Sequence, residues 1–360
     1  MRSPANSGWL ESLSPWPEEF GLGRMGALLA ELGEPQRAYP AIHVVGTNGK
    51  STATRRAAAF LEREGLLTGA YTSPHVSGWS ERIQVGGEDA GLERALARVR
   101  PSAERLGATQ FEVLTAAALA EFAAAEIDVA VVEAGLGGRL DATNVLAAGI
   151  VVLTNVALDH TEVLGSTREV IAAEKLAVVA RGATVVLGEP DWEGAARARG
   201  AVRIVHAQDV GRAAAEAFLG RPLEGDVDAG LPGRFDVVGE DVFAGAHNPA
   251  GVEWLLARLA RRDYMVVASI LADKDAEAML RSLSRVGRIL VATESGSLRS
   301  LPAAELARQA APVFDTVETM ADPGQAVARA RELAGPEGAL LVTGSLYLLA
   351  DLNVRLQRIP

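Results

Sequence analysis

Short apolar runs alternate with amphipathic segments along most of the chain. In the first two thirds, nearly continuous apolar runs predict strands at 42–45, 70–72, 127–133, 150–155 and 184–187. Helical spacing or Ala-rich composition predicts helices between them at 51–64, 111–125 and 167–180. Because apolar strands separated by helices are typical of a parallel sheet covered on both faces, the pattern predicts an α/β domain.

A second α/β series occupies the last third of the chain. Strands are predicted at 265–270, 288–293 and 339–343, and helices at 252–259, 276–284, 303–311 and 323–333. The segment 225–234 between the two series is rich in Gly, Pro and Asp, which is typical of a linker. A chain of 360 residues is long enough for two domains, and we expect them at 1–230 and 231–360.

Composition and charge narrow the class of protein. The proportions of hydrophobic (49%) and charged (22%) residues are ordinary for a globular protein, and no apolar run approaches the ~18 residues that cross a bilayer. The first 20 residues lack the apolar core of a secretory signal. The absence of cysteine excludes disulfides and thiolate metal sites. A net charge of −11 argues against broad nucleic-acid binding, so an anionic ligand would need a few focused positive groups.

The first candidate for chemistry is the turn after the strand at 42–45, which reads G-T-N-G-K-S-T at 46–52. Glycines let backbone N–H groups surround phosphate oxygens, and the N-terminus of the following helix adds partial positive charge. Lys50 would then face the β- and γ-phosphates of a nucleotide, and the Ser51 hydroxyl can bind Mg²⁺. Position 44 is Val, so the full G-x-x-x-x-G-K-[ST] spacing is not met, and the alternative is an ordinary turn with an exposed lysine.

Two polar residues follow apolar strands at the edge where ligands of open α/β sheets bind. Glu133 ends one such strand, where a carboxylate is costly unless it is paired or bound to a metal. In the glycine-rich segment that follows, Arg139 and Asp141 offer a charged pair to a ligand, and a surface ion pair is the alternative. His160 follows the next strand and suits metal or phosphate, although a lone histidine is more often structural.

Other candidates are less specific by themselves. Ser73 ends a strand, so its hydroxyl could face a metal, but Ser-Pro is more often a turn or a cap. Lys175 lies on a helix among apolar residues, which by composition alone favours a surface lysine with a buried stem. The segments G-R at 233–234, G-A-H-N-P at 245–249 and D-K-D at 273–275 are equally compatible with helix entries or caps.

Together these segments resemble the folylpolyglutamate synthase/dihydrofolate synthase family, a branch of the Mur-ligase superfamily. The resemblance covers nearly the whole chain and includes the leader at 23–36. It is carried by the segments H-V-V-G-T-N-G-K-S-T, T-S-P-H…E-R-I, F-E-V-L-T, V-V-E-A-G-L-G-G-R-L-D-A-T-N, L-D-H-T, I-A-A-E-K, G-A-H-N-P, D-K-D and V-T-G-S-L. The segment G-L-G-G-R-L-D-A-T-N contributes most to its specificity.

The resemblance implies a P-loop NTPase-like parallel-sheet domain that binds ATP, followed by a smaller Rossmann-like α/β domain that closes over the site. It implies nucleotide contacts by Thr47, Asn48, Gly49, Lys50, Ser51, Thr52, Arg234, His247 and Asn248. It implies one or two Mg²⁺ ions held by Ser51, Ser73, Glu133 and His160. It implies a substrate site made by Thr109, Gln110, Phe111, Glu112, Arg139, Leu140 and Asp141. Lys175 resembles the family's carbamylated lysine, and the residues expected to support catalysis are Lys50, His160, Lys175 and Arg234.

The activity that the resemblance implies is ATP-dependent addition of L-glutamate to a pteroate or folate carboxylate through an acyl phosphate. We expect a cytoplasmic monomer whose partners are dihydropteroate or a reduced folate and L-glutamate, with no nucleic acid and no membrane.

The chain also departs from the family pattern. Lys50 is followed directly by Ser-Thr, as in peptidoglycan Mur ligases, and Ala244 replaces the Asp that commonly precedes G-A-H-N-P. Glu19 and Phe20 stand where the family's pterin-contacting leader has a different pattern. Two alternatives therefore stay open. One is a UDP-muramyl amino-acid ligase of the same superfamily, and the other is a non-catalytic P-loop nucleotide-binding relative.

Overall fold

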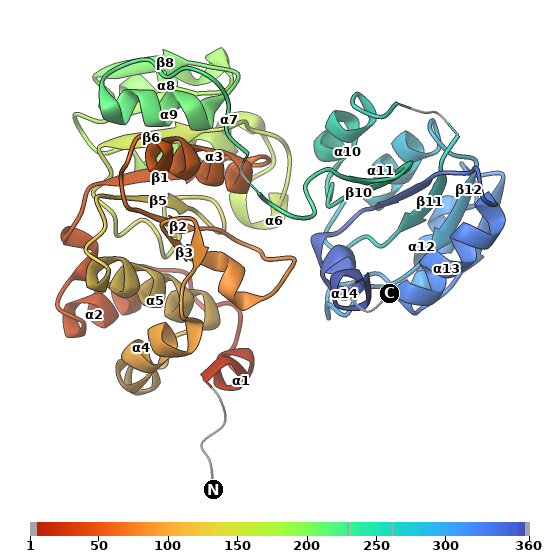
Figure 1. Ribbon diagram of the computed structural model, residues 1–360, viewed down its shortest axis with the longest axis horizontal. Helices are drawn as coiled ribbons and strands as arrows, with labels where there is room; N and C mark the ends of the chain where they lie inside the picture. The colour runs from red at the N-terminus through yellow and green to blue at the C-terminus, as the bar shows by residue number, and fades with distance from the viewer. Residues whose placement is uncertain (1–5, 229, 261–262, 357–360) are drawn as a thin grey trace, which may run out of the picture. The chain divides into compact units, whose positions relative to one another are not determined.

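The computed structural model describes residues 6–228, 230–260 and 263–356. The chain divides into two compact units, one comprising Met1–Pro74 and Trp79–Gly230 and the other His75–Gly78 and Leu231–Pro360. Each unit is built around a sheet of its own (Figure 1).

The sheet of the first unit has eight strands in the order β4-β3-β2-β5-β1-β6-β7-β8. Their bounds are β1 Ala41–Val45, β2 Thr68–Tyr71, β3 Ile83–Val85, β4 Glu88–Asp89, β5 Val129–Glu133, β6 Ile150–Leu153, β7 Thr184–Leu187 and β8 Arg203–His206. The strands from β2 to β8 in this order are parallel, and β3 and β4 add an antiparallel edge. The carboxyl ends of the parallel strands therefore meet at one edge of the sheet.

Helices cover both faces of this sheet (Figure 1). Their bounds are α1 Asn6–Glu11, α2 Gly23–Glu31, α3 Lys50–Arg63, α4 Leu92–Leu106, α5 Gln110–Ala124, α6 Thr161–Leu164, α7 Arg168–Lys175, α8 Glu193–Ala198 and α9 Val210–Leu219. Short 3-10 turns lie at η1 Pro35–Arg37, η2 Trp79–Arg82, η3 Leu176–Val178 and η4 Pro190–Trp192. Ile42 and Val44 of β1 pack toward α3 and α9, while Val45 packs toward α2, α4 and α5. This alternation places successive residues of β1 in two separate apolar cores.

The second unit has six strands in the order β13-β12-β11-β14-β10-β9. Its elements are β9 Asp236–Val238, β10 Asp241–Ala244, α10 Pro249–Leu256, β11 Met265–Ala268, α11 Ala276–Leu283, β12 Ile289–Ala292, α12 Ala303–Ala310, β13 Thr316–Thr319, α13 Pro323–Ala334, β14 Leu340–Thr343 and α14 Leu346–Leu356. The strands are parallel except β9, which pairs antiparallel with β10. Helices α10, α11 and α12 pack on one face, and α13 and α14 on the other.

The strands and helices expected from the apolar pattern are present, and apart from one helix their ends shift by at most three residues. One difference is the helix expected at 167–180, which ends at Lys175 and continues as the 3-10 turn η3. None of the helices in the described part of the chain combines the length and apolar composition that a bilayer crossing requires.

Candidate active site

The loop between β1 and α3 depends on two glycines. Gly46 has φ of +150°, and a Cβ at this position would lie 1.8 Å from Oγ1 of Thr154. Gly49 has φ of +77° and is the N-cap of α3, so a left-handed residue turns the chain into the helix. Lys50 and Ser51 consequently form the first turn of α3, where backbone N–H groups have no helical partner.

Residues after β6 hold this loop in place. The backbone N–H of Thr47 donates to the Asn155 carbonyl at 3.0 Å, and that of Asn48 donates to Asn155 Oδ1 at 3.0 Å. The Thr47 hydroxyl oxygen accepts from the backbone N–H of Ala157 at 3.0 Å. Asn155 is not among the residues predicted from the sequence, although a polar residue at the carboxyl end of an apolar strand is a usable signal.

Two lysines lie against the loop. Lys50 Nζ donates to the Thr47 carbonyl at 3.2 Å, and Lys175 Nζ donates to the Gly46 carbonyl at 2.8 Å. Lys175 is 4% exposed, so the structure places it inside the protein rather than on the surface. Burial, together with the nearby positive charge of Lys50, lowers the pKa of Lys175 to about 7. A substantial fraction of this amine is therefore neutral near neutral pH.

Glu133 joins the loop to the end of β2. Its carboxylate is 1% exposed and accepts from the Ser51 hydroxyl at 3.1 Å and from the backbone N–H of Ser73 at 3.0 Å. His160 lies after β6 at the same edge of the sheet, where it is the N-cap of α6 with φ of +49°. Its backbone N–H donates to Asp159 Oδ1 at 2.9 Å. The structure thus brings Ser51, Ser73 and Glu133 together, with His160 on the neighbouring loop.

The donor set fits a divalent cation that phosphate oxygens help to hold. Mg²⁺ is usually bound by one or two carboxylates, hydroxyls and phosphates rather than by an all-protein cage. Glu133 would supply the carboxylate and Ser51 a hydroxyl oxygen, while Ser73 contacts Glu133 through its backbone N–H. In the described part of the chain, no group of three or more His, Asp or Glu side chains is arranged to hold a metal. A cation bound at Glu133 would therefore need phosphate oxygens of a bound nucleotide to complete its coordination.

The turn after β5 is closed by Asp141, which is 6% exposed. Asp141 Oδ2 accepts from the backbone N–H of Leu136 at 2.8 Å, and Oδ1 accepts from that of Thr143 at 3.0 Å. Burial raises the pKa of Asp141 above its ordinary value. Arg139 points outward instead and donates to Glu174 Oε2 at 2.9 Å. The two residues expected to form a charged pair therefore act separately, and Leu140 between them is half-buried.

The turn also packs on the end of α7. A Cβ at Gly138 would lie 2.7 Å from the Lys175 carbonyl, so glycine is required there by close backbone approach. The backbone N–H of Arg139 donates to the Glu174 carbonyl at 3.1 Å. The turn and the buried lysine are thereby parts of one packed structure.

The segment 109–112 begins α5. Thr109 is its N-cap, and Glu112 accepts from the backbone N–H and the hydroxyl of Thr109 and from Arg24 Nε, each at 2.8 Å. Thr109 and Glu112 are buried, and the side chain of Gln110 donates to the Leu10 carbonyl at 3.1 Å. Two of these four predicted substrate residues thus form a capping box, which fixes where α5 begins.

An aromatic row extends outward from Phe111. The ring centroid of Phe111 is 6.1 Å from that of Tyr71 and 6.3 Å from that of Trp16, and Trp16 is 6.4 Å from Phe20. Trp16 and Phe20 are 38% and 42% exposed, so the outer end of the row is accessible to a ligand. Sequence reasoning missed Trp16, because nothing in the pattern placed residue 16 near residue 111.

Thr52 lies in the first turn of α3, next to Ser51, and the other predicted residues lie in the second unit. Arg234 is half-buried in the turn before β9. His247 Nδ1 is 3.0 Å from the Gly245 carbonyl. Asn248 is 1% exposed, and its Oδ1 accepts from the backbone N–H of Gly251 at 2.8 Å as the N-cap of α10. Their expected nucleotide contacts stay predictions.

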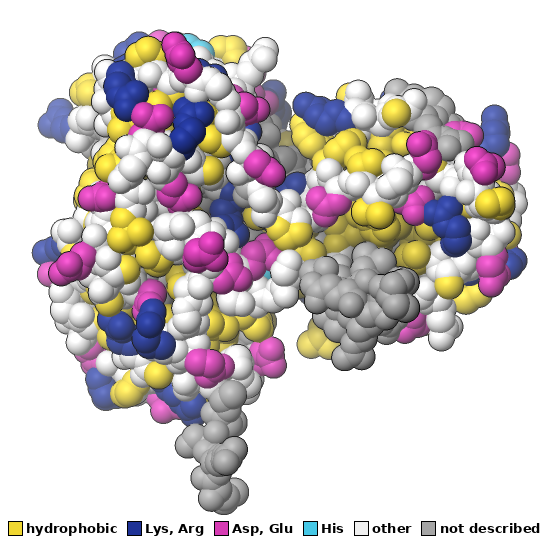
Figure 2. Space-filling view, in the orientation of Figure 1, with side chains coloured by type: hydrophobic (Ala, Val, Ile, Leu, Met, Phe, Trp, Pro, Cys, Tyr) yellow, Lys and Arg dark blue, Asp and Glu magenta, His cyan; other side chains and the backbone are white. Residues whose placement is uncertain are grey.

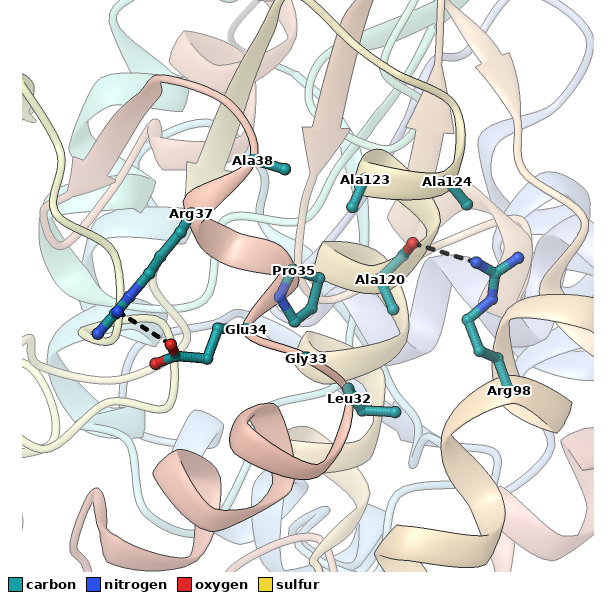
Figure 3. Close-up of a pocket in the computed structure, with 10 residues that line it drawn as sticks. All are labelled: Leu32, Gly33, Glu34, Pro35, Arg37, Ala38, Arg98, Ala120, Ala123 and Ala124. Carbon is teal, nitrogen blue, oxygen red and sulfur yellow. Dashed lines mark hydrogen bonds and ion pairs between the residues drawn. The ribbon is translucent and has the colours of Figure 1, made fainter.

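A cavity elsewhere in the first unit has a different chemistry. Acidic and basic side chains are interspersed over the visible face of this unit (Figure 2). The cavity, of about 560 Å³, lies before β1 and β5, at the amino-terminal edge of the sheet (Figure 3). Its cations are paired, Arg37 with Glu34 at 2.9 Å and Arg98 with the Ala120 carbonyl at 3.5 Å. We therefore place the candidate active site at the carboxyl edge.

Known proteins match the chain throughout its length. Residues 44–202 match the Mur ligase middle domain, and residues 233–346 match the Mur ligase glutamate ligase domain. The dihydrofolate synthase/folylpolyglutamate synthase of Mycobacterium tuberculosis is 34% identical, over 84% of this chain and 81% of that protein.

Two solved structures also resemble the chain closely. E. coli FolC in complex with DHPP and ADP has a TM-score of 0.88 and 27% identity, covering 99% of this chain and 98% of that one. A bifunctional folylpolyglutamate synthase/dihydrofolate synthase with Mn, AMPPNP and L-glutamate bound has a TM-score of 0.86 and 28% identity, with coverage of 99% and 98%. These matches confirm the fold and the ligase class expected from the motifs. The chain belongs to the folylpolyglutamate synthase/dihydrofolate synthase family of Mur ligases.

Proposed function

We propose that the chain uses ATP to join the amine of L-glutamate to a carboxyl group of a pteroate or folate. The observation that carries this proposal is the meeting of the loop at 46–51, Glu133 and Lys175 at one sheet edge. A glycine loop at a helix N-terminus suits phosphate, and the buried carboxylate suits a cation beside it. Family relatives crystallised with nucleotide, metal, glutamate or DHPP support the same assignment.

In the first step, a substrate carboxylate oxygen attacks the γ-phosphorus of ATP, and ADP leaves with the electrons of the broken bond. Repulsion between two anions is the main obstacle to this step. Lys50 would reduce the repulsion with its ammonium group, which the Thr47 carbonyl orients. In the second step, the amine of L-glutamate attacks the acyl carbon, phosphate leaves, and the nitrogen loses a proton.

The proposal includes a divalent metal ion, which would be held by Glu133, Ser51, Ser73 and His160. A bound cation supplies charge neutralisation at the phosphates. The protein's part is to hold it, with the Glu133 carboxylate already fixed by two hydrogen bonds, so that little side-chain freedom is lost when the ion binds.

Lys175 is proposed to be carbamylated. The neutral amine attacks CO₂, the new N–C bond forms, and one proton is released. Its lowered pKa supplies the neutral amine that this reaction needs. The carbamate would place a negative charge beside Lys50, which offsets the cost of burying either charge alone.

The pteridine-bearing substrate is proposed to lie along the turn at 139–141 and the aromatic row at Phe111. An aromatic surface with one accessible end suits a flat heterocycle. Residues 1–230 are proposed as the ATP-binding domain and 231–360 as the glutamate-ligase domain, which supplies Arg234, His247 and Asn248. A monomeric state and a cytoplasmic location are part of the same proposal.

One assay tests the proposal. Phosphate release is measured with ATP, Mg²⁺ and L-glutamate, comparing dihydropteroate, tetrahydrofolate and the UDP-muramyl substrate. We expect release that requires glutamate and either pteridine substrate. Release with the muramyl substrate alone would replace the proposal with the alternative that the short Lys50-Ser-Thr turn favours. ATP binding without any release would indicate a non-catalytic relative.

A further inference from the structure

A histidine lies in an otherwise apolar row at the centre of the first sheet. His43 is the third residue of β1, and its side chain is fully buried. Its partners in register are Val132 on β5 and Val151 on β6. An imidazole in such a row costs more than an aliphatic side chain unless it makes a specific hydrogen bond.

The hydrogen bond that His43 makes leads to the turn after β5. His43 Nε2 is 2.8 Å from Thr143 Oγ1, and the Thr143 hydroxyl donates to Asp141 Oδ1. A hydroxyl has one proton, so Thr143 must accept from His43, which therefore carries its proton on Nε2. Burial lowers the pKa of His43 to about 4, which agrees with a neutral ring.

The other ring nitrogen is not used. Nδ1 is buried and makes no hydrogen bond within the described part of the chain. A valine or leucine would avoid this cost, as the neighbouring strands show. The feature that distinguishes histidine here is its Nε2 donor, which reaches across to Thr143.

The three side chains connect the strand before the phosphate loop to the turn. Asp141 ties Leu136 at the start of the turn to Thr143 at its end. If Thr143 lost its donor, its hydroxyl would be free to rotate away from Asp141. The carboxylate that closes the turn would then lose one of its hydrogen bonds.

We propose that His43 is a positioning residue, which holds the Thr143 hydroxyl and thereby Asp141 and the turn at 136–143 in the orientation that receives the pteroate or folate substrate. The inference rests on the proposed function for the identity of the substrate. It does not rest on that function for the effect on the turn itself.

The test compares His43→Leu, which removes the donor, with His43→Gln, whose side-chain amide restores an N–H near the same place. We expect His43→Leu to raise KM for the pteridine substrate by about five- to tenfold, the factor that one lost hydrogen bond gives. KM for ATP should change by less than about twofold, and His43→Gln should recover most of the loss. Thr143→Val should raise KM for the pteridine substrate as much as His43→Leu does. The double variant should have no higher KM than either single variant, because each substitution breaks the same series of hydrogen bonds from His43 to Asp141.

A second measurement does not depend on turnover. Hydrogen exchange at the amides of Leu136 and Thr143 should be about five- to tenfold faster in His43→Leu and in Thr143→Val than in His43→Gln. If the turn responds in this way while the wild type releases no phosphate with pteridines, the inference stands and the proposed substrate is wrong. If the wild type is active but neither KM nor exchange distinguishes Leu from Gln, His43 only fills space and the inference is overturned.

Discussion

At the two edges of the sheet in the first unit, several charged side chains differ in how far they are exposed to solvent. At the carboxyl edge, Glu133, Asp141 and Lys175 are 1%, 6% and 4% exposed. At the amino-terminal edge, the cavity in Figure 3 is lined by Arg37 and Arg98, whose side chains are 73% and 39% exposed. The arginines that line this cavity are exposed, although Arg98 lies 3.6 Å from the buried carboxylate of Glu121, whereas the three charged side chains named at the carboxyl edge are all buried.

This difference in burial distinguishes a candidate ligand-binding site from a surface cavity. Exposed ion pairs such as Arg37–Glu34 cost little and contribute little, because water screens both partners. A buried ammonium or carboxylate is costly, and it persists where a ligand or a partner compensates for its lost hydration. Buried charge next to a glycine loop is therefore the reason for placing the candidate active site at the carboxyl edge.

The largest effect is expected from Lys50→Ala. The variant should lower glutamate-dependent phosphate release by about 10³-fold, since it removes the positive charge expected at the γ-phosphate. The fold should be kept, because Lys50 is half-buried and its ammonium bonds a backbone carbonyl of its own loop. Phosphate release and circular dichroism check the two parts, and wild-type turnover in this variant would remove Lys50 from the phosphate site.

Lys175→Met is expected to change stability in a pH-dependent way. Below pH 7, Lys175 is protonated in both folded and unfolded chains, so the folded wild type carries the full cost of a buried cation. Between about pH 7 and pH 10.5 the folded amine is neutral while the unfolded one still binds a proton, so wild-type stability rises with pH through this window.

The methionine variant should therefore be more stable than the wild type by about 4 to 5 kcal/mol near pH 6, and most of this gap should close toward pH 10. Denaturant unfolding in CO₂-free buffer measures it. Added bicarbonate should stabilise the wild type alone if Lys175 is carbamylated. A gap that stays constant with pH would show that the Lys175 amine is not held neutral by burial.

A smaller effect is expected from His160→Ala. If His160 is a metal ligand as proposed, its loss should raise the Mg²⁺ concentration needed for half-maximal activity by about tenfold. His206→Ala is the matched control, since His206 lies on β8 and pairs with Glu193 at 2.8 Å, away from the loop. Magnesium titrations at saturating ATP compare the two. An equal requirement in both variants would exclude His160 from the metal site.

Much of the carboxyl edge follows from the sequence by simple geometry. Parallel apolar strands end at one edge, so Glu133 at the end of β5 and the loop after β1 were expected at the same edge. Gly46 and Gly49 were readable as the turn of a phosphate loop, and the backbone angles agree. The edge strands β8 and β13 were missed, because strands with one exposed side lack a continuous apolar run.

The burial of the charged side chains of Lys175 and Asp141 could not be predicted from residue types and spacing alone. The apolar neighbours of Lys175 fit a surface lysine as well as an interior one, and its partner, the Gly46 carbonyl, lies 129 residues away. Asp141 presents the same difficulty, because its hydrogen bonds to Leu136 and Thr143 depend on the shape of a turn that cannot be read from the sequence. The resemblance to a family indicated that these residues matter for function. Their hydrogen-bond partners became known only from the structure.

The smallest effect is expected from Arg37→Ala at the opposite edge. Arg37 is half of an exposed ion pair, so its loss should change the free energy of unfolding by less than about 0.5 kcal/mol. Phosphate release and the KM of each substrate should equal those of the wild type. Reduced activity, or a raised KM for any substrate, would show that the cavity before β1 takes part in binding. Charge exposed to water at the amino-terminal edge would then matter as much as charge buried at the carboxyl edge, and the contrast between the two edges would no longer locate the active site.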